Sequence, residues 1–122
     1  DDFLYLFFPD DDPGHKLGLE SLRRLEDRAL SEDHIPVSLE TMKAQLAVIA
    51  STGSSVWDAL ADVTIPVLVA NGAHDRMIDA YGTFAMVGRL PNAKAILYSD
   101  AGHGFLFQHI EDFAGEVQAF LE

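Results

Sequence analysis

The segment at residues 64–76, Thr-Ile-Pro-Val-Leu-Val-Ala-Asn-Gly-Ala-His-Asp-Arg, places the tightest constraint on the fold. Its apolar run, residues 65–70, is rich in β-branched side chains and does not alternate with polar residues. Such a run is typical of a strand that is buried in a parallel sheet. Asn71 and Gly72 then favour a turn, because both residue types tolerate a positive φ angle. An acid, Asp75, follows the turn at once.

The same arrangement returns about 28 residues later. Residues 94–98, Lys-Ala-Ile-Leu-Tyr, predict a second strand, and Ser-Asp-Ala-Gly-His-Gly at 99–104 places His103 just beyond it. Open α/β sheets carry their active sites at the carboxyl edge of the strands. We therefore expect Asp75 and His103 to lie at one edge of a parallel sheet.

The remaining segments are mostly helical in pattern. Apolar residues at three- and four-residue spacing predict helices over about 17–31, from a cap at Ser38 to about residue 50, from a cap at Asp79 to Leu90, and from about Glu111 to the C-terminal residues. Residues 56–61 predict a short helical turn. The aromatic run Phe3–Phe8 predicts a strand or buried extended segment, residues 9–14 a loop, and residues 32–36 and 51–55 helix ends.

Composition excludes several classes of protein. A chain of 122 residues with 48% hydrophobic residues is at most one domain, and its formal charge of −12 would repel a nucleic acid backbone. The absence of cysteine excludes disulfides and thiolate metal sites. The run Phe3–Phe8 is far shorter than the ~20 apolar residues that span a bilayer, so no membrane association and a cytoplasmic location are expected.

At these residues the chain resembles the C-terminal half of an α/β-hydrolase. The resemblance rests on residues 65–78, on Leu90-Pro-Asn-Ala-Lys-Ala-Ile-Leu-Tyr, and on Asp100-Ala-Gly-His-Gly-Phe-Leu-Phe-Gln-His. It implies an α/β fold class, namely a partial α/β-hydrolase fold. Residues 1–59 would form a helical segment similar to the cap of such enzymes. Residues 60–122 would form strand–helix–strand–helix of the parallel core sheet.

The resemblance also implies the chemistry. Asp75 would be the acid and His103 the base of a Ser-His-Asp triad that hydrolyses an ester or a related small substrate, with no organic cofactor and no metal. Taken alone, an acid after a strand is usually a turn former, and Gly-His-Gly is usually a turn. Both residues in this order, each after a strand, favour the triad.

One part of the triad is missing from the sequence. The family places its serine on a Gly-x-Ser-x-Gly elbow upstream of the acid, and this sequence contains no such elbow. The nearest string, Gly53-Ser54-Ser55, lacks the second glycine and does not follow a strand. We therefore expect the chain to be inactive alone and to be part of a larger hydrolase, to pair with a polypeptide that carries the nucleophile, or to dimerise.

Other residues are assigned structural roles. His74 is predicted to be a loop residue, and His15, His34 and His109 show no metal-ligand spacing. The acidic run 10–12 lacks the spacing of a calcium loop and predicts a solvated turn. Phe105, Leu106 and Phe107 favour the core over an acyl pocket.

Two alternatives to the enzyme stay open. The chain could be a non-catalytic remnant of the hydrolase fold that acts as a binding or interaction module. It could also be a product of proteolysis or truncation.

Overall fold

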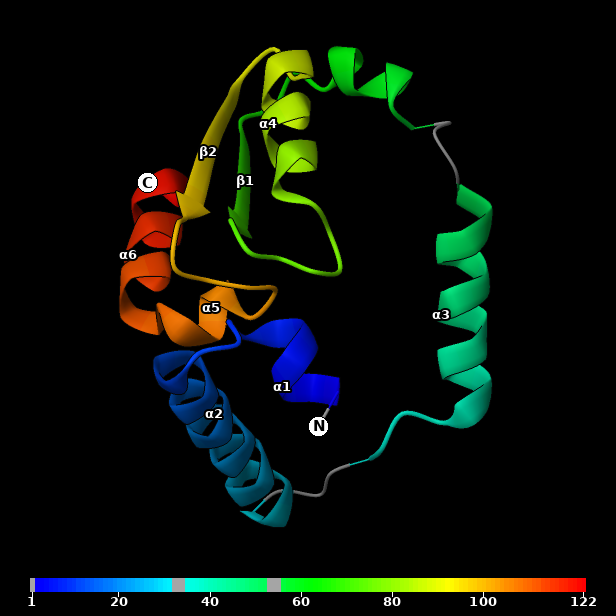
Figure 1. Cartoon of the computed structure of the whole chain (residues 1–122). Coiled ribbons are helices and arrows are strands. Elements are labelled where there is room, and N and C mark those ends of the chain that lie inside the picture. The colour runs from blue at the N-terminus through cyan, green and yellow to red at the C-terminus, as the bar shows by residue number, and fades with distance from the viewer. Residues whose placement is uncertain (1, 32–34, 53–55) are drawn as a thin grey trace.

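The computed structural model describes residues 2–31, 35–52 and 56–122 (Figure 1). The predicted order of strand, helix, strand and helix after residue 60 is confirmed. In chain order the elements are α1 (Asp2–Phe7), α2 (Asp12–Ser31), α3 (Leu39–Thr52), the 3-10 helix η1 (Asp58–Asp62), β1 (Val67–Gly72), α4 (Ala80–Arg89), β2 (Ala93–Tyr98), α5 (Phe105–Gln108) and α6 (Ile110–Leu121).

The two strands form a parallel pair, as the sequence predicts. Their register runs from Val67 opposite Ala93 to Gly72 opposite Tyr98. β1 begins at Val67 rather than Ile65, because Pro66 has no N–H for the ladder. The Val67 amide instead donates to Asn92 O at 3.0 Å, which ties the start of β1 to the turn before β2.

The connection between the strands is α4, whose start is fixed by a side-chain cap. The Asp79 carboxylate accepts a hydrogen bond from the Tyr81 amide at 2.8 Å, as expected of an acid at the N-cap position. Thr83 and the C-cap residue Leu90 are buried, whereas Tyr81 and Phe84 point to solvent. α4 therefore covers one face of the strand pair (Figure 1).

One expectation about β1 is wrong. The sequence predicts a strand buried on both faces, yet residues 67–70 are only half-buried. The physical reason is that the described residues contain a sheet of two strands, with α4 on one face. The apolar side chains of β1 could therefore bury more surface than the described elements cover.

The last helix lies beside β2 and is tied to it by side chains at both ends of the strand. The Lys94 ammonium pairs with the Glu116 carboxylate, and the Tyr98 hydroxyl donates to Asp112 Oδ2 at 2.7 Å. α6 begins at Ile110, one residue before the predicted start. The short helix α5 precedes it, and Phe105 packs edge-to-face on Phe113 of α6 at 5.2 Å between ring centroids.

The aromatic run at the N-terminus is a helix, so the prediction of a strand or extended segment is wrong. In α1, Phe3 and Phe7 are one helical turn apart and their rings stack at 4.5 Å. Leu4 and Phe8 are buried, together with Leu90 and Ala101. The run has the composition of a strand, but burial of Leu4 and Phe8 against α2 requires helical spacing.

α2 begins five residues earlier than predicted. Asp11 Oδ1 accepts a hydrogen bond from the Gly14 amide at 2.7 Å, which caps the helix, and Pro13 occupies its first turn. The segment 9–14 is therefore only in part a loop. In the acidic run, Asp10 and Asp11 form an exposed bend, as the predicted solvated turn requires, and Asp12 begins α2. The expectation of no calcium loop there stays a prediction.

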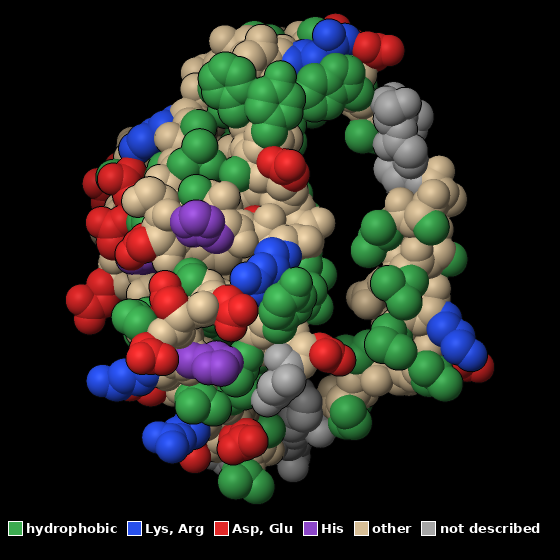
Figure 2. All heavy atoms as spheres, in the orientation of Figure 1, with side chains coloured by type: hydrophobic (Ala, Val, Ile, Leu, Met, Phe, Trp, Pro, Cys, Tyr) green, Lys and Arg blue, Asp and Glu red, His purple; other side chains and the backbone are tan. Residues whose placement is uncertain are grey.

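α3 stands apart from the other elements (Figure 1). Its predicted cap is present, since the Thr41 amide donates to Ser38 Oγ at 3.1 Å. Its apolar stripe is exposed, and Figure 2 shows hydrophobic side chains along this helix and an open gap beside it. The stripe comprises Leu39, Met42, Leu46 and Ile49. Of the predicted helix ends, residues 32–34 and 53–55 lie outside the described residues.

In the ranges 2–31, 35–52 and 56–122, no helix is long and apolar enough to cross a membrane.

α1 and α2 pack on each other, and α2 contacts α5 of the C-terminal segment. The domain boundary at residue 59 therefore stays a prediction from the sequence.

We predict that Gly82→Ala and Gly88→Ala each raise the free energy of unfolding by about 1 kcal/mol, since alanine is the better helix former by that amount. A Cβ at either position meets no atom within 4 Å. Urea unfolding followed by circular dichroism measures the change. Gly18→Ala is the matched control in another helix: its Cβ would lie 2.5 Å from Leu4 Cδ2, so this variant should be less stable.

We further predict that Tyr98 stabilises the fold below pH ~10 and loses this effect as the pH rises. Burial and the Asp112 hydrogen bond raise the pKa of Tyr98 from 10 to about 12. Because the neutral phenol is favoured in the folded chain, the stability contribution is lost as the pH passes through the folded value. Ultraviolet titration of phenolate in a Tyr5→Phe, Tyr81→Phe background isolates Tyr98. Asp112→Asn should lower its pKa, and an unchanged titration would contradict the assignment.

Candidate functional site

The loops that follow β1 and β2 are joined to each other by backbone hydrogen bonds. The Ala73 amide donates to Tyr98 O at 2.8 Å, and the His74 amide donates to Ala101 O at 2.9 Å. The parallel pairing thus continues past the ends of the strands into the two loops. As a result the residues that follow, Asp75 and His103, start from backbones that are already held together.

Gly72 allows this close approach. A Cβ at Gly72 would lie 2.2 Å from Gly102 O and 2.4 Å from Ala101 O, both backbone atoms that cannot move aside like a side chain. Glycine is therefore required here for space. The sequence indicates a turn at this position, whereas the structure shows that its more specific role is to admit the histidine loop.

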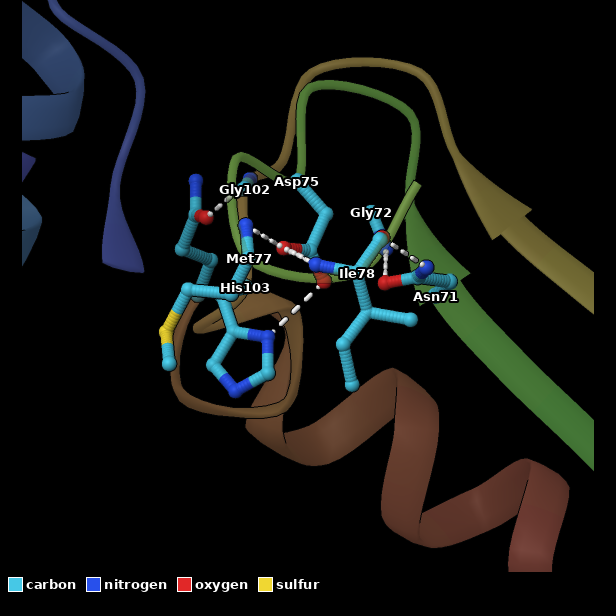
Figure 3. A network of polar contacts seen from close by, with 8 residues as sticks. Asn71, Gly72, Asp75, Met77, Ile78, Gly102 and His103 are labelled. Atoms are coloured by element: carbon cyan, nitrogen blue, oxygen red, sulfur yellow. Dashed lines mark hydrogen bonds and ion pairs between the residues drawn. The ribbon is translucent and has the colours of Figure 1, made fainter. Parts of the chain in front are cut away.

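Asp75 organises the first loop with one oxygen and faces the histidine with the other (Figure 3). Oδ1 accepts hydrogen bonds from the amides of Met77 at 2.7 Å and Ile78 at 2.9 Å. Oδ2 lies 2.8 Å from His103 Nδ1, and the Asp75 side chain is 1% exposed. Each carboxylate oxygen has a partner, which is what a buried carboxylate requires.

The geometry sets the tautomer of His103. An ionised carboxylate only accepts hydrogen bonds, so Nδ1 must carry the proton that points at Asp75. In the neutral ring Nε2 then holds a lone pair, and in Figure 3 this atom lies on the side of the ring away from Asp75. The His103 side chain is 26% exposed. A half-exposed imidazole with a free lone pair and a buried carboxylate behind it can act as a general base.

Asn71 closes the loop that presents Asp75. It is 4% exposed, its amide nitrogen donates to Ile78 O at 2.9 Å, and its Oδ1 accepts from the Gly72 amide at 2.8 Å. The side chain therefore bridges both ends of the segment 72–78. The sequence analysis treats Asn71 only as a turn former and misses this role.

Gln108 supports the second loop in the same way. Its Oε1 accepts a hydrogen bond from the Gly102 amide at 3.1 Å, and its Nε2 donates to Asp100 O at 3.3 Å. Both contacts hold the segment that leads directly into His103. Nothing in the sequence distinguishes Gln108 from an ordinary polar residue, because its function depends on the short helix α5 turning it back toward the loop.

Two other described histidines, His74 and His109, make no part of the Asp75–His103 hydrogen bond. His74 is an exposed loop residue, as predicted. His109 stacks on the Tyr98 ring at 4.4 Å and contacts Asp100 Oδ1 at 3.0 Å. Of the remaining candidates, His34 and the weak nucleophile candidates Gly53-Ser54-Ser55 lie outside the described residues. In the described part of the chain no three His, Cys, Asp or Glu side chains gather to hold a metal ion.

A polar hollow of about 700 Å³ adjoins Asp75. The start of α2 and the two loops line it, with Asp10, Asp11, His74, Arg76 and Asp100 as the charged or titratable side chains besides Asp75. Phe105 and Phe107 are half-buried and Leu106 is 37% exposed. Phe105 packs on Tyr98 and Phe113, but Leu106 is exposed, so the predicted core position is wrong for Leu106.

Comparison with known proteins gives two similar chains. A solved structure, an alpha/beta hydrolase fold protein from Chitinophaga pinensis, matches with a TM-score of 0.82 and 31% identity over 98% of this chain. A 2-hydroxy-6-oxononadienedioate/2-hydroxy-6-oxononatrienedioate hydrolase 2 from Pseudomonas putida is 24% identical over 99 residues, which are 81% of this chain. No family model matches the sequence.

Both relatives are much longer than the matched region. The chain spans 44% of the solved structure and 33% of the P. putida hydrolase. The similarity therefore concerns one part of each relative.

We predict that Asp75→Asn preserves the loop and reverses the histidine tautomer. The asparagine carbonyl can still accept from Met77 and Ile78, but its amide would donate to Nδ1, which moves the ring proton to Nε2. Imidazole ¹⁵N shifts measure the tautomer. Asp75→Ala should instead leave the Met77 and Ile78 amides without their acceptor, at a cost of about 1–3 kcal/mol in urea unfolding. An unchanged Nδ1–H signal in Asp75→Asn would contradict the bond.

Proposed function

We propose that this chain supplies the acid and the histidine of a Ser-His-Asp hydrolase, since it has part of the α/β-hydrolase fold. Asp75 is the proposed acid and His103 the proposed base. The single observation that carries the proposal is the bond of 2.8 Å between His103 Nδ1 and the buried Asp75 carboxylate. It joins an acid after one strand to a histidine after the next, in the order that the resemblance implies.

The roles follow from this geometry. His103 Nε2 would take the proton of a serine hydroxyl as that oxygen attacks the substrate carbonyl, and would then give the proton to the leaving group. Asp75 would hold the ring in the required tautomer and stabilise the imidazolium that forms during attack. Neither step needs a metal or an organic cofactor.

The proposed reaction class is hydrolysis of an ester or a related small carbonyl substrate. The P. putida relative is named for hydrolysis of 2-hydroxy-6-oxononadienedioate and the corresponding trienedioate. At 24% identity that substrate is not assigned to this chain. The Chitinophaga pinensis relative supports the fold and the hydrolase family, and its name states no substrate.

The serine must come from outside the printed sequence, since this contains no Gly-x-Ser-x-Gly elbow. We propose that the partner is the nucleophile-bearing half of the fold, either as further sequence of the same protein or as a second polypeptide. The half-buried strand β1 and the exposed apolar stripe of α3 support this, because such surfaces are usually covered. By itself the chain is proposed to be inactive.

A non-catalytic binding module is the alternative function, and self-association as a homodimer is the alternative partner. The same exposed apolar stripe on α3 favours both. Light scattering distinguishes them from the enzyme: a dimer of this chain that excludes the nucleophile-bearing half would favour the module. The cytoplasmic location and the lack of a nucleic acid or membrane partner stay predictions from composition.

The test is intact-mass spectrometry after treatment with a fluorophosphonate probe. We predict that the chain alone keeps its mass, whereas co-expression with a hydrolase half that carries a Gly-x-Ser-x-Gly elbow yields an adduct on the serine of that half. Ester hydrolysis should appear only in the pair. His103→Ala should abolish it, and Asp75→Asn should lower kcat by about 10⁴-fold, the cost of the wrong tautomer in such triads.

A fluorophosphonate adduct on a serine of this chain alone would overturn the proposal. The matched control is His15→Ala, which removes an exposed histidine of α2 that lies outside the proposed site. That variant should leave hydrolysis by the pair unchanged.

A further inference from the structure

The C-terminal end of α1 is bound by the two residues that directly follow the acid and the histidine. A helix ends with carbonyls that have no partner within the helix. In α1, Tyr5 O accepts a hydrogen bond from Arg76 Nη1 at 2.6 Å, and Phe7 O accepts one from the Gly104 amide at 2.6 Å. Arg76 follows Asp75, and Gly104 follows His103. One short helix is therefore tied to both loops of the site.

Side chains reinforce both contacts. The Phe7 ring packs edge-to-face on the His103 imidazole, with 4.9 Å between centroids and planes at 85°. The Arg76 guanidinium lies over the Tyr5 ring, 4.2 Å from its centroid. A cation at a helix C-terminus is also favoured by the helix dipole. Each loop is thus held to α1 by one backbone carbonyl and one aromatic ring.

The backbone of α1 lies directly against the backbone of the loop that carries His103. A Cβ at Gly102 or at Gly104 would lie 2.8 Å from Phe7 O. The glycines on either side of His103 are therefore needed to let α1 approach the histidine loop. From the sequence, Gly-His-Gly indicates only a turn.

We propose that α1 is a positioning element for the acid–histidine pair. Phe7 of α1 and Arg76, which binds α1 from the Asp75 loop, together hold His103 Nδ1 on the Asp75 carboxylate. Phe7 limits rotation of the imidazole, while Arg76 fixes the Asp75 loop relative to the same helix. Neither residue is proposed to contact substrate. The geometric effect on His103 is independent of activity, whereas its catalytic consequence rests on the proposed function.

The first test uses the full 122-residue chain and needs no activity. The exchange rate of the His103 Nδ1 proton with water, measured on ¹⁵N-histidine-labelled protein, reports how often the bond to Asp75 opens. An aromatic pair corresponds to roughly 2- to 12-fold in an equilibrium constant, so Phe7→Ala should raise the exchange rate by about that factor. Phe7→Leu, which keeps apolar volume without a ring, should give a smaller rise. His103→Gln assigns the signal among the five histidines.

Arg76 provides a variant that does not disturb the core, because its side chain is exposed. Arg76→Ala should also raise the exchange rate, and Arg76→Lys should restore part of the protection by returning a donor and a charge. Arg89→Ala is the matched control. Arg89 donates to Trp57 O at 2.8 Å and lies over the Trp57 ring at 5.8 Å, so it makes the same two kinds of contact away from the site.

The outcomes separate the possibilities. Faster exchange in Phe7→Ala and Arg76→Ala, with no change in Arg89→Ala, supports the proposal. Equal rates in wild type and Arg76→Ala would overturn it, as would an equal rise in Arg89→Ala, which indicates general loss of stability. If Phe7→Ala does not fold, Phe7→Leu and the Arg76 variants decide.

A second measurement tests whether the positioning of His103 by α1 and Arg76 affects catalysis. In the reconstituted pair of chains, Arg76→Ala should lower kcat while leaving KM unchanged, since the residue acts through His103 and not on the substrate. A change in KM alone would contradict the positioning role. If the pair shows no hydrolysis at all, the proposed function fails, and the proton-exchange result still decides whether α1 positions His103.

Discussion

The buried carboxylate of Asp75 is the interaction on which the site depends. One of its oxygens organises the loop after β1 through the amides of Met77 and Ile78, and the other binds His103. Because the side chain is almost fully buried, removal of any of these donors leaves a lone pair without water or protein to replace it. The loop conformation and the histidine orientation are therefore coupled through one group.

The sheet edge was predictable because its determinants are local. The apolar run, the glycine that follows it and the acid Asp75 specify a strand followed by a loop. The second strand repeats this pattern with His103 in place of the acid. The caps at Ser38 and Asp79 were predictable for the same reason, since each binds an amide within three residues. The juxtaposition of Asp75 and His103 then follows from parallel pairing.

The contacts that cross between segments could not be predicted. Phe3–Phe8 has the composition of a strand, and only its docking against α2 and the histidine loop makes it a helix. Gln108 and Asn71 bind backbone atoms six and seven residues away, and Arg76 binds one 71 residues away. These contacts depend on how the loops and α1 fold back, which the residue types alone do not indicate. Likewise the half-burial of β1 depends on how many strands the sheet has, which its own sequence does not state.

The register between β1 and β2 also sets the relative positions of Asp75 and His103. Gly72 lies opposite Tyr98 at the end of the ladder. Asp75 comes three residues after Gly72, and His103 comes five residues after Tyr98. A slip of one residue would displace one strand end by about 3.3 Å along its partner and turn each side chain to the opposite face. A displacement of that size would break the hydrogen bond of 2.8 Å between His103 and Asp75. This bond can form in one register only, so its presence reports that the two strands are correctly aligned.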